Sequence, residues 1–185
     1  MSLVTIAGID PGLQGAIAIV QLEIRGHLDI AMKSVIKVFD MPVALVDSGK
    51  LPDMRRLEDV LRQYSVDAIA MEWPGPRNPN EKDEEGREIR SYKSEWRFAI
   101  GCGLTLSTCL STCQRVVLYA PRSWKSALKL SRDKGGSIDL ARSLVSPEVA
   151  AAHFEFASKD GRAEAFLVAE HLRRQMCSGK PVAWV

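Results

Sequence analysis

Four acidic residues stand at positions where a carboxylate is costly unless it has a function. Asp10 closes an almost continuous apolar run, and Glu72 closes a second, shorter one. A charge beside an apolar strand is unfavourable unless it is paired or binds a metal ion. Asp160 and Glu164 open the last amphipathic segment four residues apart, which places both on one face of a helix. Carboxylate oxygens in such a group are suitable ligands for Mg²⁺ or Mn²⁺.

Each of these four residues also has a structural explanation. Asp10 precedes Pro-Gly and is a typical turn residue, and Glu72 can face solvent at the end of an edge strand. Asp160 can be the N-cap of the last helix, with Glu164 interacting favourably with the helix N-terminus. Their joint occurrence favours a shared site, in which two divalent ions about 3.5–4 Å apart would hydrolyse a phosphodiester.

The elements that must position these residues follow from the hydrophobic pattern. Three apolar stretches, at residues 3–10, 16–24 and about 29–39, predict an antiparallel meander of strands. Two further strands are predicted at residues 68–72 and 115–119. Apolar residues at intervals of three and four predict helices, together with the start signals Pro121, Ser137 (as an N-cap) and Ser146-Pro147. These helices cover residues 54–64, 95–112, about 160–176 and the three segments that follow the start signals.

This order of elements predicts an α/β protein with the RNase H-like fold. Its five-stranded mixed sheet combines the three-stranded antiparallel meander with two parallel strands, and helices flank the sheet. In that topology the first and fourth strands are neighbours, and the last helix packs across their ends. The four carboxylates would therefore converge on one point. We expect residues 1–185 to form a single nuclease domain.

The composition is that of an ordinary globular protein, with 46% hydrophobic and 26% charged residues. No apolar run approaches the roughly 18–20 residues of a membrane span, so no membrane partner is expected. The opening residues show no targeting segment, and the four cysteines lack a zinc-binding spacing. We interpret the cysteines as reduced, mostly buried thiols. The expected location is therefore intracellular, in the cytoplasm or nucleoid or in an organelle matrix.

Basic residues gather in two segments, although the net charge is only +2. One group lies between the fifth strand and the Gly135-Gly136 pair, and the other lies in or just after the long polar segment that follows Glu72. Such runs are usually solvated faces, but they can also hold phosphates. The candidate DNA-binding residues are Arg122, Lys125, Lys129 and Arg132 in the first group and Arg77, Arg87, Arg90 and Lys93 in the second.

Several of these motifs together resemble those of the RuvC-like Holliday junction resolvases. Ile9-Asp10-Pro11-Gly12, with Gly15 beyond it, is similar to the first motif of that family, and Ala70-Met71-Glu72 is similar to the second acidic motif. Asp160 to Ala165 (DGRAEA) and Trp124-Lys125 resemble elements of the chloroplast-type branch. The sequence departs from the bacterial pattern in the Asp160–Glu164 spacing and in Trp73-Pro74 after Glu72.

The resemblance implies a crossover junction endodeoxyribonuclease that acts in DNA recombination and repair. It implies a homodimer that nicks two opposed strands of a four-way DNA junction, with two Mg²⁺ ions that Mn²⁺ can replace. Asp10 would bridge both ions, with Glu72 on one ion and Asp160 and Glu164 on the other. The helix at residues 95–112 is the candidate dimer contact because an apolar stripe and small residues occur together along it. An ordinary core helix is the alternative.

Other functions remain open at the level of the sequence. A related nuclease on the same fold would act on RNA–DNA hybrids, flaps or damaged duplex with the same carboxylates. A non-catalytic DNA-binding module would keep the fold but would not need all four acidic residues. A sugar-kinase-like ATPase needs two such domains around its nucleotide, which 185 residues cannot supply.

Overall fold

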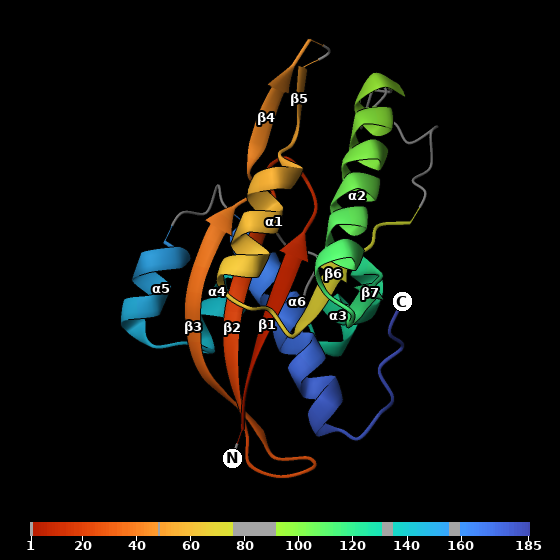
Figure 1. Cartoon of the computed structure of the whole chain (residues 1–185). Helices are drawn as coiled ribbons and strands as arrows, with labels where there is room; N and C mark the ends of the chain where they lie inside the picture. Colours follow the sequence, from red (N-terminus) through yellow and green to blue (C-terminus); the bar gives the residue numbers. More distant parts are fainter. Residues whose placement is uncertain (1, 48, 76–91, 131–134, 156–159) are drawn as a thin grey trace.

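The computed structural model describes residues 2–47, 49–75, 92–130, 135–155 and 160–185. Five strands form one mixed sheet in the order β3-β2-β1-β6-β7, and β1 lies at its centre (Figure 1). The first three strands pair antiparallel, whereas β6 runs parallel to both β1 and β7. The strands of this sheet are β1 (Ser2–Asp10), β2 (Ala16–Ile24), β3 (Ile30–Asp40), β6 (Ala68–Glu72) and β7 (Val116–Tyr119). The predicted RNase H-like arrangement of strands is confirmed.

Helices cover both faces of this sheet. In Figure 1, α1 and α2 lie in front of the sheet and α6 crosses behind it. The described helices are α1 (Met54–Gln63), α2 (Tyr92–Thr112), α3 (Pro121–Ala127), α4 (Gly136–Ser143), α5 (Pro147–His153) and α6 (Asp160–Cys177). None of them is long and apolar enough to cross a membrane.

Alternation along the central strands divides the core between the two faces. In β1, Ile6 packs in the cluster that contains α6, whereas Ala7 and Ile9 pack in the cluster that contains α1. In β6, Ala68 and Ala70 belong to the α6 side. Because side chains alternate along a strand, the residues that end β1 and β6 at even positions also project toward the α6 side.

The structure adds one hairpin that the sequence pattern did not predict. β4 (Val43–Val46) and β5 (Gly49–Pro52) pair antiparallel and form a separate two-stranded sheet between β3 and α1. Leu45 in β4 is 80% exposed, so β4 does not show the alternation of a half-buried strand. The hairpin extends beyond the end of the main sheet at which β1 and β6 terminate (Figure 1).

Two predicted helix starts differ from the structure. The second helix begins at Tyr92, three residues before the predicted Glu95. The predicted N-cap Ser137 is wrong, since α4 begins at Gly136 and its N-cap is Gly135, whose φ is 112°. Glycine adopts this left-handed conformation without a steric penalty, and the Ser137 hydroxyl is left to donate elsewhere.

The residues that follow α6 return to the outer edge of the sheet. Trp184 forms an antiparallel bridge with Val117 of β7, and the backbone N–H of Val185 donates to the carbonyl of Val116 at 2.8 Å. This tail therefore satisfies backbone groups of the edge strand β7 that no other strand among the described residues pairs with.

Candidate functional site

Three acidic side chains converge at one end of the main sheet. Asp10 and Glu72 end the adjacent parallel strands β1 and β6, one residue beyond the register pair Ile9–Met71. Both share the strand parity of residues that face α6, and Glu164 lies one turn into that helix. The charges of Glu72 and Glu164 both act on Asp10. The structure thus brings together three of the four predicted site residues, which we call the carboxylate cluster.

Close packing of α6 on β1 makes this convergence possible. A Cβ atom at Gly161 would lie 2.5 Å from the carbonyl oxygen of Gln14 and 3.1 Å from Oδ2 of Asp10. Gly8 similarly lies directly against the backbone of Ala165. No other residue type fits these positions without a shift of the backbone, so the two glycines set how near Glu164 comes to Asp10.

The turn after β1 holds the Asp10 carboxylate from the other side. The backbone N–H of Gly12 donates to Oδ1 of Asp10 at 3.4 Å, and the backbone N–H of Gly15 donates to the carbonyl of Gly12 at 2.8 Å. The N–H of Met41 donates to the carbonyl of Gly15, also at 2.8 Å. The Pro-Gly turn predicted from the sequence is therefore present, and it fixes the carboxylate rather than merely ending the strand.

The environment of Asp10 disfavours its ionised form. Burial, followed by the negative charges of Glu72 and Glu164, raises the pKa of Asp10 from 3.8 to about 7, although Gly12 and Lys125 act in the opposite direction. Burial and the charge of Glu164 likewise raise the pKa of Glu72. Carboxylates that are partly buried and repel one another are stabilised by a nearby cation.

Two consecutive residues of α3 contact the other two carboxylates. The indole Nε1–H of Trp124, a fully buried side chain, donates to Oε2 of Glu72 at 2.7 Å. Nζ of Lys125 lies 2.6 Å from Oε1 of Glu164, and the Ser137 hydroxyl donates to the same oxygen at 3.3 Å. Sequence reasoning placed Lys125 on a substrate phosphate and assigned no site role to Trp124.

The oxygen donors suit a hard divalent cation, but their present arrangement does not surround one. Among the residues that the structure describes, no group of three or more His, Cys, Asp or Glu side chains is arranged to hold a metal ion. The contacts of Trp124 and Lys125 give a physical reason, because they direct oxygens of Glu72 and Glu164 toward α3. The donor set fits Mg²⁺ in its chemistry, and its role as a metal site stays a prediction.

Asp160, the fourth predicted ligand, is exposed at the first residue of α6. Its Oδ1 accepts a hydrogen bond from the backbone N–H of Gly161 at 3.0 Å. The contact is to the next residue, whereas the side chain of an N-cap, the alternative predicted from the sequence, accepts from a residue two or three positions further on. Its place in a metal site stays a prediction.

The predicted DNA-binding residues divide into three groups. Arg122, Lys129 and Lys93 are exposed, as a phosphate contact requires. Lys125 is half-buried in its ion pair with Glu164. The remaining four, Arg77, Arg87, Arg90 and Arg132, lie outside the described residues.

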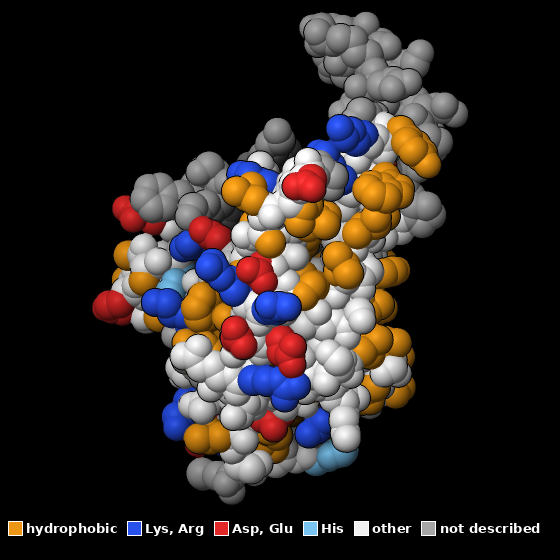
Figure 2. Space-filling model, turned by 45° about the horizontal axis from the view of Figure 1, so that its top comes forward, with side chains coloured by type: hydrophobic (Ala, Val, Ile, Leu, Met, Phe, Trp, Pro, Cys, Tyr) orange, Lys and Arg blue, Asp and Glu red, His pale blue; other side chains and the backbone are white. Residues whose placement is uncertain are grey.

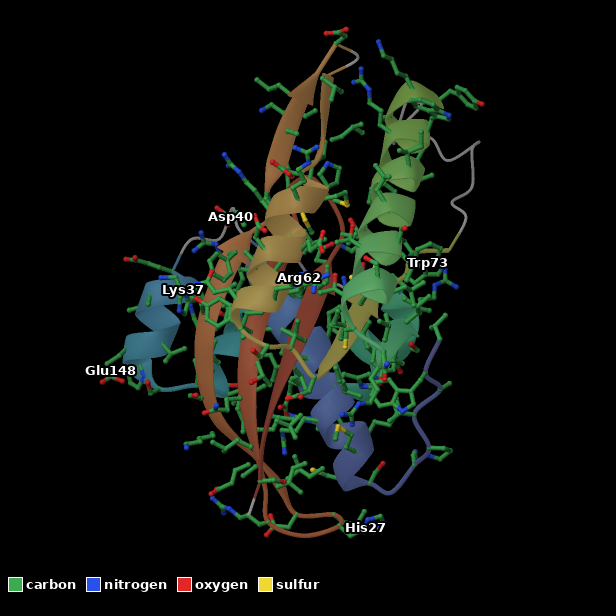
Figure 3. All side chains as sticks on the ribbon, in the orientation of Figure 1. His27, Lys37, Asp40, Arg62, Trp73 and Glu148 are labelled. Atoms are coloured by element: carbon green, nitrogen blue, oxygen red, sulfur yellow. The ribbon has the colours of Figure 1, made fainter. Side chains whose placement is uncertain are left out.

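A pocket of about 290 Å³ adjoins the carboxylate cluster on the side of α2. Burial, and then the charges of Asp10 and Glu72, raise the pKa of the Cys102 thiol in this pocket to about 12. Figure 3 shows Trp73, another lining residue, where the chain leaves β6 beside α2. The pocket is lined by Trp73, Pro74, Gly75, Glu95, Phe98, Ala99 and Cys102.

The four cysteines are free thiols, as expected from their spacing. Cys102, Cys109 and Cys113 are buried, and Cys177 is partly buried. The pKa of the Cys109 thiol is also raised to about 12, chiefly by burial. The protonated thiols of Cys102 and Cys109 are poor nucleophiles and poor metal ligands, so neither is a candidate for the chemistry of this site.

Comparison with known proteins identifies the fold. No family model and no curated protein matches the chain. The structure of T. thermophilus RuvC in complex with Holliday junction substrate matches with a TM-score of 0.57 at 17% identity, and a Thermus thermophilus RuvC structure matches at 0.53 and 19%. Each match covers 93% of this chain and 96% of the other. The chain therefore has an RNase H-like fold in the form found in RuvC.

Proposed function

We propose that this protein is a divalent-metal-dependent nuclease that resolves four-way DNA junctions. The observation that carries the proposal is the carboxylate cluster of Asp10, Glu72 and Glu164 at one end of a RuvC-like sheet. One similar structure is that of T. thermophilus RuvC in complex with a Holliday junction substrate. Assignment to the chloroplast-type branch rests on the sequence motifs at Trp124-Lys125 and at residues 160–165.

Different residues of this chain would bind the metal ions and the DNA backbone. Asp10, Glu72 and Glu164, with Asp160 as a fourth candidate, would hold two Mg²⁺ ions, for which Mn²⁺ can substitute. Ions bound there would supply the charge that activates a water and stabilises the leaving oxygen. Exposed cations around the site would position the phosphate backbone, since such contacts orient DNA without reading its sequence.

The pocket beside the carboxylate cluster suits an unstacked base. Trp73 is 36% exposed at its rim and offers an aromatic face. Stacking of a base on such a face is worth about 1–3 kcal/mol and tolerates different sequences. We assign Trp73 to the base next to the cut phosphate.

Symmetric cutting requires two copies, and α2 offers a surface for the second. Trp96 is 52% and Leu104 38% exposed, so these two side chains of the predicted stripe lie outside the core. The stripe consists of Trp96, Ala99, Ile100, Gly103 and Leu104. Figure 2 shows apolar side chains on this outward surface. Ala99, Gly103 and Ser107 follow one another at intervals of four residues, and a Cβ atom at Gly103 would meet no atom within 4 Å. Small residues in one row let a second helix approach closely, so we assign this face to a homodimer.

The decisive experiment is a cleavage assay with labelled DNA. Purified protein in Mg²⁺ should place paired, symmetric nicks in a four-way junction with a short mobile core, and should spare linear duplex, flap and RNA–DNA hybrid. Glu72→Gln should abolish nicking while the junction is still bound in Ca²⁺. Cleavage of the hybrid but not the junction would identify a different nuclease on the same fold. Tight junction binding with no nicking in Mg²⁺ or Mn²⁺ would identify a non-catalytic binding module.

A further inference from the structure

Lys125 is placed differently from an ordinary phosphate-binding lysine. Its Nζ lies 2.6 Å from Oε1 of Glu164. Its positive charge also acts to lower the pKa of Glu72 and of Asp10. Burial alone lowers the pKa of Lys125, but the hydrogen bond and charge of Glu164 outweigh this effect and raise the pKa above its ordinary value. The ammonium group therefore interacts with every member of the carboxylate cluster.

The neighbouring residue fixes the backbone from which this lysine extends. Trp124 is fully buried and donates to Glu72, so the first turn of α3 is anchored in the core. The Lys125 side chain is 36% exposed, so part of it is in contact with solvent. The ammonium can leave Glu164 by rotation of its own side chain without displacement of α3.

The charges of the carboxylate cluster and of Lys125 determine what this placement of the ammonium does. Three ionised carboxylates carry three negative charges, of which the Lys125 ammonium balances one, whereas a divalent cation in its place would balance two. Two cations of the same sign close to Glu164 would repel each other strongly in a partly buried site. The lysine and a divalent ion are therefore alternatives at this carboxylate.

We propose that Lys125 is the counter-cation of the carboxylate cluster in the metal-free protein, and that it moves from Glu164 to a substrate phosphate when a divalent cation binds. This inference rests on the proposed nuclease function. It explains why the described carboxylates do not surround a metal position, since the lysine holds one of their oxygens. It also predicts that the Lys125 side chain weakens Mg²⁺ binding but promotes cleavage of the junction.

Removal of the ammonium should strengthen metal binding and weaken cleavage. Lys125→Met keeps most of the side-chain length but removes the charge. Without DNA, calorimetric titration at pH 8 should show Mg²⁺ binding to this variant about tenfold more tightly than to the wild type, a difference of about 1.4 kcal/mol. Mg²⁺ should also raise its thermal unfolding midpoint more than that of the wild type. With saturating Mg²⁺, junction nicking by the variant should fall at least tenfold.

Two further variants separate charge from folding effects. Lys125→Arg keeps the positive charge, so its Mg²⁺ affinity should stay within about threefold of the wild type even if its packing is altered. Lys180→Met removes an exposed lysine that follows α6, and should change neither quantity.

Equal or weaker Mg²⁺ binding by Lys125→Met would overturn the exchange while leaving the nuclease proposal intact, because the wild type would still bind metal and cut junctions. Wild-type protein that binds no Mg²⁺ would overturn both. If Lys125→Met fails to fold in EDTA, refolding in millimolar Mg²⁺ supports the exchange, because the divalent ion then replaces the missing counter-cation. Failure to fold in Mg²⁺ as well refutes it, because the divalent ion then does not replace the missing counter-cation.

Discussion

The raised pKa of Asp10 makes a quantitative prediction about stability. The folded protein binds the Asp10 proton more tightly than the unfolded chain does, since the pKa rises from 3.8 to about 7. Stability is therefore lost as the pH rises through this interval. A difference of about three pH units corresponds to about 4 kcal/mol, of which about 2–3 kcal/mol falls between pH 5 and pH 8.

Asp10→Asn removes the ionisation and should remove this loss. In EDTA, the free energy of unfolding of the variant relative to the wild type should increase by about 2–3 kcal/mol between pH 5 and pH 8. Urea unfolding at both pH values measures the difference, and titrating groups that do not interact with Asp10 cancel from it. Asp47→Asn, on the exposed hairpin, is the control for the loss of one carboxylate from the net charge.

The same pair of proteins tests the role of the ion. Mg²⁺ at pH 8 should stabilise the wild type more than Asp10→Asn and so reduce the difference between them. If the stability of the variant relative to the wild type is the same at pH 5 and pH 8, the ionised form of Asp10 is not disfavoured in the folded protein, and the reasoning is refuted. A wild type that gains stability relative to the variant as the pH rises would refute it more strongly.

Three other predictions test the scaffold. Gly161→Ala should destabilise the protein by about 1–3 kcal/mol and abolish nicking, because the added Cβ atom would clash with the backbone of Gln14 and with the Asp10 carboxylate. Wild-type activity of this variant would contradict the close packing of α6 on β1. Glu170→Gln should cost about 3 kcal/mol at pH 7. Burial raises the pKa of Glu170, but hydrogen bonds from Arg173 and Arg174 lower it overall. The stability that the ionised Glu170 contributes to the wild type should therefore be lost as the pH falls below 4.5. The same loss of stability at low pH in the variant would contradict this. Gly103→Glu should convert a dimer to a monomer in light scattering at unchanged far-ultraviolet dichroism, and a monomeric wild type would exclude α2 as the contact.

Strongly patterned elements could be predicted from the sequence. The runs that form β2 and β6 are bounded by turn signals, and their predicted limits, residues 16–24 and 68–72, agree with the structure. The face of α6 is buried as predicted, with Ala163, Phe166 and Leu172 all inaccessible. The hairpin at residues 43–52 was missed because its strands are four residues long and Leu45 faces solvent.

The site could be predicted only in part, because its partners are distant in the chain. The acidic ends of β1 and β6 are local signals, so Asp10 and Glu72 were found. The contacts of Trp124 with Glu72 and Lys125 with Glu164 join residues 52 and 39 positions apart. No local periodicity encodes these pairs. A buried Trp next to a Lys at the start of a short helix was the available signal, and it became interpretable only once the packing of α3 was known.

The tail that bridges β7 affects how copies of the chain can associate. An uncovered edge strand is a template for continuous sheet formation between molecules. Trp184 and Val185 occupy that template on the β7 side. Pairing of β7 with a strand of another molecule is therefore hindered at these residues, and the proposed dimer contact would lie on the exposed face of α2 instead. If copies pair through α2 as proposed, the tail on β7 would favour closed pairs over open filaments.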